Sequence, residues 1–453
     1  MFNLKIFIIN YHKIIMSMKK VTIIGLGFVG LSLISFLSSK RINVIGIDAN
    51  KEKIEILKKG IPDFFEPELK EYLNKGKKFQ KFFTKIDTKT INSDLIFITV
   101  GTPINNQNKI NLEFIKSVTK SISQNLNGIS SKPSIILKST VVPGTASKIV
   151  KPILEKYGNR EKHDYEILSN PEFLREGSAM YDTIRPHVIV VGGRNELSRK
   201  NLINFYKQVY PKQQKYVETN NTTAEMIKYA NNAFLATKIS FINSIANICQ
   251  NIPGTNIDEI SKVMGMDPRI SSQFLRAGPG YGGSCFPKDI QALISFSKST
   301  GYKPELLEAV QHSNKKQVKM IITILTNNLK NLKNKKIGIL GLAFKENTDD
   351  IRESVSVHLI EKLLKKECQI ITHDPKAINN TKKIFNERIT YCQKMEDVFK
   401  KSDCGILMTP WEEYKKINSK LIKKMNYKIF IDTRRILRIN DKDITFISLG
   451  VGI

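Results

Sequence analysis

Val21-Thr22-Ile23-Ile24-Gly25-Leu26-Gly27-Phe28-Val29-Gly30 is the stretch that decides the fold. Its first four residues predict a short strand, and the glycines at 25, 27 and 30 predict a tight turn into a helix that continues to Leu37. A second strand pattern, Asn43 to Ile47, ends at Asp48, about 20 residues further on. The combination is typical of a dinucleotide site, because glycines let the backbone approach a pyrophosphate and a helix N-terminus favours its negative charge. Asp48 can accept a hydrogen bond from a ribose 2′-hydroxyl and would repel a 2′-phosphate, so NAD is expected rather than NADP.

Polar loops follow several of the other predicted strands. They begin with Gly101-Thr102-Pro103, Ser139-Thr140 and Asn170-Pro171-Glu172. Ligands bind beyond the carboxyl ends of parallel strands, so these loops are candidate binding segments.

A long helix is predicted near the middle of the chain. Thr222 and Glu225 fit a capping box, and a helical pattern runs from there to Gln250. Its apolar positions, such as Met226 and Phe234, indicate a buried helix.

A second strand-and-turn pattern starts at Lys336, with further strands at 369–372, 405–408 and 428–431. We therefore expect an α/β fold with two Rossmann-like, doubly wound domains joined by a central helical domain that contains the long helix. The expected segments are an extension (1–17), an NAD-binding domain (18–215), the helical domain (216–330) and the second Rossmann-like domain (331–453).

Composition argues against several other classes of protein. The 41% hydrophobic content is that of a globular chain. The net charge of +30 could indicate a nucleic-acid or membrane partner, but the lysines form no long basic tract, so we interpret it as an overall field that attracts an anionic substrate. Five scattered cysteines indicate a reducing compartment, and no apolar stretch is long enough to span a membrane. We expect a cytoplasmic protein, and we interpret residues 1–17 as a disordered extension rather than a signal peptide.

Gly278-Pro279-Gly280-Tyr281-Gly282-Gly283-Ser284-Cys285-Phe286-Pro287-Lys288-Asp289 is the second informative stretch. Its four glycines predict a loop that can wrap closely around a ligand, and Pro287 suits the first turn of a following helix. Cys285 would lie at the N-terminus of that helix beside Lys288, where the thiolate is favoured. A lone cysteine is more often an inert apolar residue, but the glycine loop and the adjacent Asp289 favour a nucleophile.

Two further pairs are candidates for catalysis. Lys228 and Asn232 lie four residues apart, hence on one helix face, where an ammonium and an amide can stabilise an alkoxide or oxyanion. Glu172 and Glu176 follow a strand end, which makes them candidates for acid–base chemistry. Either pair alone could equally be part of a solvated helix face. No metal site is expected.

With these motifs the chain resembles the UDP-glucose/GDP-mannose dehydrogenase family, and within it the branch that oxidises UDP-glucose. The resemblance covers nearly everything from Met18 onward. It rests on Gly25-Leu26-Gly27-Phe28-Val29-Gly30, Gly101-Thr102-Pro103, Lys138-Ser139-Thr140, Asn170-Pro171-Glu172-Phe173-Leu174-Arg175-Glu176-Gly177, Lys228-Tyr229-Ala230-Asn231-Asn232, Gly282-Gly283-Ser284-Cys285-Phe286-Pro287-Lys288-Asp289, and Phe344-Lys345 with Asp349-Asp350-Ile351-Arg352-Glu353-Ser354.

The resemblance implies an NAD-binding domain, a central dimerisation domain and a carboxy-terminal UDP-binding domain. It also implies a four-electron oxidation of the sugar C6 alcohol to a carboxylate, with two NAD and a thiohemiacetal and thioester on Cys285. UDP-glucuronate would be the product, and the enzyme would be a homodimer or a higher oligomer.

Site residues follow from the resemblance by matching position. Lys228 and Asn232 would hold the C6 oxygen, Asp289 and Thr140 would orient a water, and Glu172 would be the acid–base group. Contacts to NAD are implied for Gly25, Gly27, Phe28, Val29, Gly30, Asp48, Lys53, Thr102, Pro103, Thr140, Glu176 and Arg352. Contacts to the UDP-sugar are implied for Glu172, Phe173, Leu174, Lys228, Asn232, Phe274, Arg276, Gly278, Tyr281, Gly282, Phe344, Lys345 and Arg434, with Arg269 reaching the neighbouring subunit's site.

Three alternatives remain open at this point. The same chemistry could act on GDP-mannose or a UDP-N-acetylhexosamine, although the N-acetyl branch usually has His where this chain has Ser284. A single-hydride dehydrogenase would not need Cys285, and a basic nucleic-acid-binding protein should show a localised basic stripe. The chain also departs from the family pattern, with Glu68 in place of a usual glycine and Asn108 within a segment where an Asp-Gly turn is usual.

Overall fold

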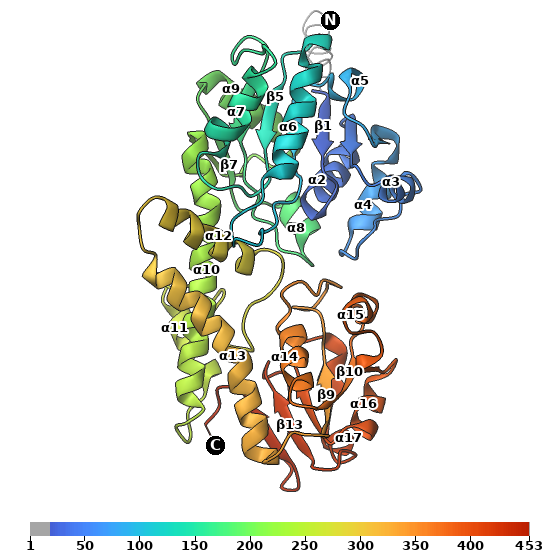
Figure 1. Ribbon diagram of the computed structural model, residues 1–453, viewed down its shortest axis with the longest axis vertical. Helices are drawn as coiled ribbons and strands as arrows, with labels where there is room; N and C mark the ends of the chain where they lie inside the picture. Colours follow the sequence, from blue (N-terminus) through green and yellow to red (C-terminus); the bar gives the residue numbers. More distant parts are fainter. Residues whose placement is uncertain (1–18, 453) are drawn as a thin grey trace, which may run out of the picture. The chain divides into compact units, whose positions relative to one another are not determined.

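A computed structural model describes residues 19–452, so the extension predicted for residues 1–17 lies outside the described part (Figure 1). The chain divides into two compact units, one ending at Tyr229 and the other beginning at Ala230. The boundary falls inside the long helix α10 (Asn221–Cys249).

An eight-stranded sheet forms the centre of the first unit, with the strand order β3-β2-β1-β4-β5-β6-β7-β8. Neighbouring strands are parallel except for β6 and β7. The strands are β1 (Val21–Ile24), β2 (Val44–Ile47), β3 (Gln80–Phe83), β4 (Leu95–Ile98), β5 (Ser134–Leu137), β6 (Glu166–Ser169), β7 (Ile189–Gly193) and β8 (Tyr216–Thr219). The helices are α2 (Phe28–Ser39), α3 (Lys51–Lys58), α4 (Leu69–Lys75), α5 (Thr88–Ile91), α6 (Glu113–Asn125), α7 (Lys151–Glu155), α8 (Ala179–Ile184) and α9 (Glu196–Val209).

Both faces of this sheet are buried. Ile23 packs into one hydrophobic cluster with Phe97 and Ile136, whereas Ile24 packs into another with Ile96 and its neighbours. Successive residues of a strand point to opposite faces, so near-continuous apolar strands are what a doubly covered parallel sheet requires.

The start of α10 differs from the prediction. The Asn220 side chain accepts a hydrogen bond from the Thr223 backbone N–H at 2.8 Å, so Asn220 caps the helix rather than Thr222. Glu225 turns inward instead of completing a capping box. The prediction that the apolar positions are buried is also partly wrong, because Met226 is 38% and Phe234 67% exposed in the single chain.

The second unit contains a six-stranded parallel sheet with the order β11-β10-β9-β12-β13-β14, the same arrangement as the first six strands of the other sheet. Its strands are β9 (Lys336–Leu340), β10 (Gln369–His373), β11 (Thr390–Tyr391), β12 (Cys404–Leu407), β13 (Ile429–Asp432) and β14 (Thr445–Ser448). Its helices, after the part of α10 from Ala230 on, are α11 (Ile257–Met266), α12 (Phe286–Ser299), α13 (Glu305–Leu329), α14 (Val355–Leu364), α15 (Ile378–Phe385), α16 (Met395–Lys401) and α17 (Ser419–Ile422).

The architecture is therefore two parallel-sheet α/β domains with a central helical region, as the sequence predicted. The first sheet extends to Thr219 in β8, beyond the boundary predicted at residue 215. Within residues 19–452, every helix is too short or too polar to span a membrane.

Candidate active site

The glycine turn after β1 leaves space at the N-terminus of α2. Gly25 has φ +98°, and a Cβ there would lie 2.7 Å from the Val100 nitrogen. A Cβ on Gly30 would lie 1.9 Å from the Gly25 carbonyl oxygen, so both positions require glycine. A Cβ on Gly27, which caps α2, would meet no atom within 4 Å and would only fill the space before the helix. This space, at a helix N-terminus, fits a pyrophosphate.

Asp48 lies beside this turn at the end of β2. Its Oδ2 accepts from the Leu26 N–H at 2.9 Å and its Oδ1 from the Asn50 N–H at 3.0 Å. These two donors use half of the about four acceptor positions of a carboxylate, so ribose hydroxyls can still bind. Lys53 pairs with Asp63 at 3.1 Å, and its Nζ lies 3.8 Å from Asp48 Oδ2.

Other residues predicted to contact NAD lie along the same edge of the sheet. The Thr102 hydroxyl donates to the Thr140 carbonyl at 2.8 Å, which joins the loops after β4 and β5. The Phe28 ring packs 4.0 Å from that of Phe64, measured between centroids. Val29 and Glu176 are partly buried and Pro103 is exposed. Arg352 belongs to the second unit, where its guanidinium pairs with Asp350 at 2.6 Å.

A buried ion pair lies after β6. Glu172 Oε1 is 3.0 Å from Lys228 Nζ, and the two side chains are only 7% and 4% exposed. The other carboxylate oxygen accepts from the Leu174 backbone N–H, and the Lys228 ammonium lies 5.5 Å from the centre of the Phe173 ring. The structure thus brings four predicted residues together. Glu172 lies in a loop before α8, so it is not part of a solvated helix face.

Lys138, to which the sequence reasoning assigned no role, adds a second ammonium to this cluster. Its Nζ donates to Asn170 Oδ1 at 3.0 Å, and the Tyr206 hydroxyl donates to the same oxygen at 2.6 Å. Desolvation lowers the pKa of Lys138 to about 8; Glu172 opposes this shift, and Lys228 adds to it. Its place at the carboxyl end of β5, two residues before Thr140, is the sequence signal that could have identified it.

Cys285 is the N-cap of α12, and Pro287 lies in the first turn, as predicted. It is the one cysteine of the five that is not buried. Burial raises the pKa of Cys368 to about 11 and that of Cys404 to about 12, which disfavours their thiolates. The Cys285 carbonyl accepts from the Asp289 N–H at 2.8 Å. Exposure and a helix N-terminus are the conditions that favour a reactive thiolate at Cys285.

Asp289 links Cys285's helix to α10. The Asp289 side chain is 1% exposed, and its two oxygens accept from Asn232 Nδ2 at 2.7 Å and from Lys288 Nζ at 2.6 Å. Cys285, Asp289 and Asn232 therefore form one polar cluster within the second unit.

The glycine loop before Cys285 packs against the second sheet. A Cβ on Gly282 would lie 2.2 Å from the Glu353 carbonyl oxygen, and one on Gly283, which has φ +84°, would lie 2.7 Å from the Phe344 ring. A Cβ on Gly278 would lie 3.0 Å from Arg434 Nη1. The close approach explains why the loop is rich in glycine.

Several residues predicted to bind the UDP-sugar therefore converge on this loop. Arg276 donates to the Arg434 carbonyl at 3.4 Å, the Phe274 and Tyr281 rings both pack edge-on against Phe286, and the Lys345 ammonium lies 5.8 Å from the centre of the Phe344 ring. Arg269 is separate: its exposed guanidinium pairs with Asp267 at 2.7 Å.

Arg435 holds the loop in place, and sequence reasoning missed it. Its side chain is 1% exposed and donates to the Ala277 carbonyl at 2.7 Å, to Asp258 at 2.8 Å and to the Leu449 carbonyl at 3.1 Å. One arginine thus joins α11, the glycine loop and the end of β14. Its neighbour Arg434 donates to the Met408 carbonyl at 2.7 Å, and burial lowers its pKa to about 10.

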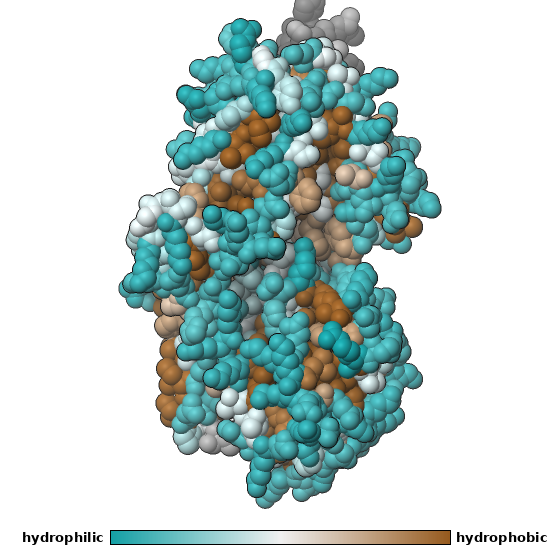
Figure 2. All heavy atoms as spheres, in the orientation of Figure 1, coloured by the Kyte–Doolittle hydropathy of each residue, from teal (hydrophilic) through white to brown (hydrophobic). Residues whose placement is uncertain are grey.

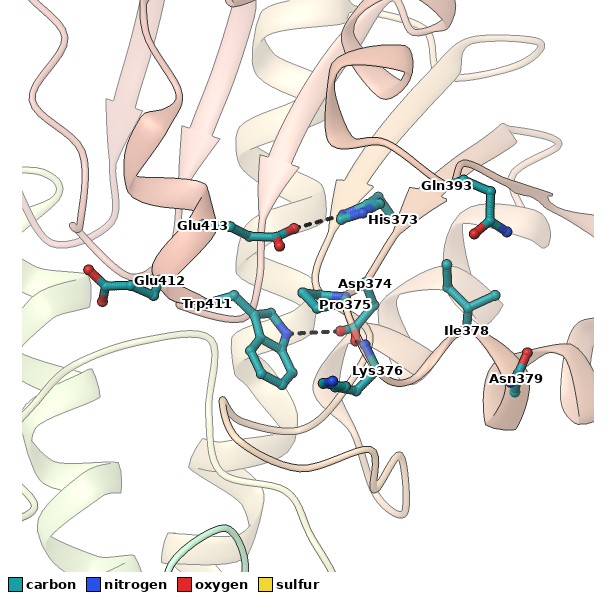
Figure 3. Close-up of a pocket in the computed structure, with 10 residues that line it drawn as sticks. All are labelled: His373, Asp374, Pro375, Lys376, Ile378, Asn379, Gln393, Trp411, Glu412 and Glu413. Carbon is teal, nitrogen blue, oxygen red and sulfur yellow. Dashed lines mark hydrogen bonds and ion pairs between the residues drawn. The ribbon is translucent and has the colours of Figure 1, made fainter. Parts of the chain in front are cut away.

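A cavity of about 680 Å³ lies at the carboxyl ends of β10 and β12 in the second sheet (Figure 3). It is lined by His373, Asp374, Pro375, Lys376, Ile378, Asn379, Gln393, Trp411, Glu412 and Glu413. Asp374 ends β10 as Asp48 ends β2, and Gly341 has the same φ of +98° as Gly25.

The Asp374 carboxylate differs from that of Asp48 in its partners. It accepts from the backbone N–H groups of Leu342, Ala343, Lys376 and Ala377 and from Trp411 Nε1, at 2.7 to 3.1 Å. These donors fill the about four acceptor positions of a carboxylate. Asp374 therefore stabilises the protein's own loops and does not share the open acceptor positions of Asp48.

Comparisons with known proteins agree with this arrangement. Models of the UDP-glucose/GDP-mannose dehydrogenase family match at residues 19–210 (NAD binding domain), 222–316 (central domain) and 338–439 (UDP binding domain). A UDP-glucose 6-dehydrogenase of Bacillus subtilis is 36% identical over 94% of this chain and 91% of its own length. One of Rickettsia bellii is 37% identical over 93% and 96%.

Solved structures give the same result. A UDP-glucose dehydrogenase from Pyrobaculum islandicum matches with a TM-score of 0.89 and 29% identity, over 96% of this chain and 98% of that one. A UDP-D-ManNAc dehydrogenase from Pyrococcus horikoshii matches with a TM-score of 0.84 and 25% identity, over 95% and 99%.

The glycine turn with Asp48, followed in the chain by a second Rossmann-like sheet, defines an NAD-dependent dehydrogenase. The chain belongs to the UDP-glucose/GDP-mannose dehydrogenase family.

Proposed function

We propose that this chain oxidises UDP-glucose to UDP-glucuronate with two NAD, using Cys285 as the nucleophile. The observation that carries the proposal is a single half-buried cysteine at the N-terminus of α12, in contact through its backbone with Asp289. A nucleophilic cysteine is needed because the aldehyde carbon can lose its remaining hydrogen as hydride only after a nucleophile has added to that carbon. The named relatives at 36–39% identity are UDP-glucose 6-dehydrogenases, which supports the choice of reaction.

The proposed reaction has four balanced steps. The C6 alcohol loses a proton and a hydride and becomes an aldehyde. The Cys285 thiolate adds to that carbon, and the oxygen takes a proton, which gives a thiohemiacetal. Loss of a second hydride and the hydroxyl proton gives a thioester, and water then releases the carboxylate and restores the thiol. NAD, when bound, accepts the hydride in each oxidation.

The side chains to which we assign these steps have matching chemistry. Lys228 and Asn232 would hold the C6 oxygen, and their ammonium and amide donors stabilise negative charge that develops there. Glu172, which pairs with Lys228, would move a proton in thiohemiacetal formation or thioester hydrolysis. Asp289 and Thr140 would orient the attacking water.

The identity of the sugar is proposed from the residue that precedes Cys285, because related enzymes act on other nucleotide sugars. Ser284 precedes Cys285, and its hydroxyl lies 3.6 Å from the Cys285 sulfur. The N-acetyl sugar branch of the family usually has His at this position, so Ser284 favours UDP-glucose. The alternative is the same oxidation of a UDP-N-acetylhexosamine or of GDP-mannose.

We also propose that the enzyme works as a homodimer in the cytoplasm. Phe234, Phe241 and Ile248 are 67%, 49% and 56% exposed and recur every seven residues along α10, so they form one apolar stripe. Figure 2 shows apolar side chains along the edge formed by α10 and α11. A stripe of this kind suits packing against a second copy across a two-fold axis. Free cysteines and the need for NAD favour the cytoplasm.

The decisive experiment measures NADH formed per nucleotide sugar consumed, for UDP-glucose, GDP-mannose and UDP-N-acetylhexosamines. We expect two NADH per UDP-glucose and no free aldehyde as the final product. One NADH per sugar, with aldehyde accumulating, would contradict the role of Cys285. Faster turnover of a UDP-N-acetylhexosamine than of UDP-glucose would instead identify the N-acetyl sugar as the substrate.

A further inference from the structure

Lys228 has two tasks in the proposed reaction. It pairs with the buried Glu172 carboxylate at 3.0 Å, and it would also hold the C6 oxygen of the substrate. An ammonium drawn toward a negatively charged substrate oxygen stabilises Glu172 less, and a buried carboxylate is costly without a nearby counter-charge. Glu172 therefore needs a second positive group nearby.

Lys138 is such a group. It ends β5, and its Nζ donates to Asn170 Oδ1 at 3.0 Å. Asn170 opens the loop that carries Glu172, and it is 1% exposed. The Tyr206 hydroxyl donates to its Oδ1 and its own Nδ2 donates to the Val190 carbonyl at 2.7 Å, so Asn170 is fixed from three sides. Lys138 is thereby held in a defined position relative to the Glu172 loop.

The cluster contains two ammonium groups and one carboxylate. Lys138 and Lys228 are positive and Glu172 is negative, so the group carries one excess positive charge when all three are ionised. Such an excess of positive charge favours an oxyanion that develops on the substrate.

We propose that Lys138 is a positioning residue of this reaction: it orders the Glu172 loop through Asn170 and supplies a second positive charge to the cluster that contains Glu172 and Lys228. The proposal rests on the proposed function, because it assigns Lys138 a part in the same oxidation. Lys138 itself acts through Asn170 and Glu172 and is not a catalytic residue.

A change with pH follows from the geometry. The charged groups that face Lys138 are Glu172 from the loop after β6 and Lys228 from α10, with the Tyr206 hydroxyl from α9 across Asn170. Burial raises the pKa of Tyr206 well above 10, so that hydroxyl stays neutral. Desolvation lowers the pKa of Lys138 to about 8, so above that pH the excess charge disappears. Activity should therefore fall on an alkaline limb near pH 8.

The test compares Lys138→Met, which removes the charge, with Lys138→Arg, which keeps it at every accessible pH. Lys120→Met on the exposed side of α6 is the matched control. We would measure kcat and KM for UDP-glucose and NAD between about pH 6 and 10, with thermal unfolding as a check on folding. Removing a group that supports acid–base chemistry should lower kcat about tenfold or more near pH 7, part of the about 10²–10⁴ that such catalysis contributes.

We expect kcat of Lys138→Met to be lower than that of the parent near pH 7 and to show no further fall near pH 8. Its KM for NAD should stay unchanged. Lys138→Arg should keep at least a third of the parent rate, with its limb moved to higher pH. Lys120→Met should match the parent.

Three results would overturn the proposal. In the first, kcat of Lys138→Met depends on pH as it does in the parent and has the same size. In the second, kcat of Lys138→Met is lowered by the same factor at every pH, with the alkaline fall near pH 8 retained. In the third, Lys138→Arg is as slow as Lys138→Met. A parent that oxidises no UDP-glucose would refute the proposed function, and this role with it, whereas an active parent with an unmoved limb refutes only the role of Lys138.

Discussion

Glu225 offers a prediction whose size can be worked out from the structure. Its side chain is buried, with the residue 3% exposed, and its two oxygens accept from the Gly144 N–H at 2.6 Å and the Ala146 N–H at 3.0 Å. The Ser169 hydroxyl donates to it at 3.2 Å. Burial nevertheless outweighs these donors and raises the pKa of Glu225 from 4.5 to about 7. The perturbation we consider is Glu225→Gln, which removes the titration and keeps the shape.

The sign of the effect follows from proton binding. Between pH 4.5 and about 7 the folded chain holds a proton on Glu225 that the unfolded chain has lost, so stability falls as pH rises through this window. Below pH 4.5 the group contributes no penalty, and above about pH 7 the penalty is constant. At about 1.4 kcal/mol per pKa unit, a shift from 4.5 to about 7 amounts to about 3 kcal/mol.

The assay is urea unfolding, followed by far-ultraviolet circular dichroism, near pH 5 and pH 8. We expect the stability of Glu225→Gln relative to the parent to rise by about 3 kcal/mol between about pH 5 and about pH 8. The glutamine amide nitrogen cannot accept from the Gly144 or Ala146 N–H, so the variant also carries a cost that is the same at both pH values. Glu71→Gln on the exposed side of α4 is the control and should change neither value. A difference in stability between the variant and the parent that is the same at both pH values would refute the reasoning, since Glu225 would then titrate alike in the folded and unfolded chains.

Cys285→Ser should stop turnover after the first oxidation, because a serine alkoxide forms far less readily than a thiolate near neutral pH; normal steady-state turnover would remove Cys285 from the mechanism. Asp48→Ala should weaken NAD binding and reduce the preference for NAD over NADP. The Asp48 carboxylate repels a 2′-phosphate, and without it the nearby Lys53 ammonium would attract that phosphate. Equal catalytic efficiency of the parent with both cofactors would contradict this. Arg269→Ala and Cys285→Ala, each inactive alone, should regain activity when mixed if the exposed Arg269 completes a neighbouring subunit's site. Background activity after subunit exchange confirmed by mass would place Arg269 outside that role.

The sequence by itself determined features that depend on a few adjacent residues. The glycine turn at 25–30, the helix that begins after Cys285 and those strands that the sequence predicted are found where the patterns indicated, because φ of +98° at Gly25 or a proline in a first helical turn is a local requirement. The same local rule explains the departures from the family pattern. Glu68 has φ +62° and Asn108 has φ +58°, so the left-handed turn is kept at both positions without a glycine.

Contacts between distant residues decided the rest, and no local pattern contains them. Glu225 fits a capping box in sequence, yet it turns to Gly144 and Ala146 because burying that helix face brings their N–H groups within reach. Asp48 and Asp374 end equivalent strands, but Trp411, 37 residues after Asp374, donates to one and not to the other. Whether a carboxylate can take a ligand depends on how many donors the folded chain has already directed to it, and that number exists only once the sheets and loops have packed.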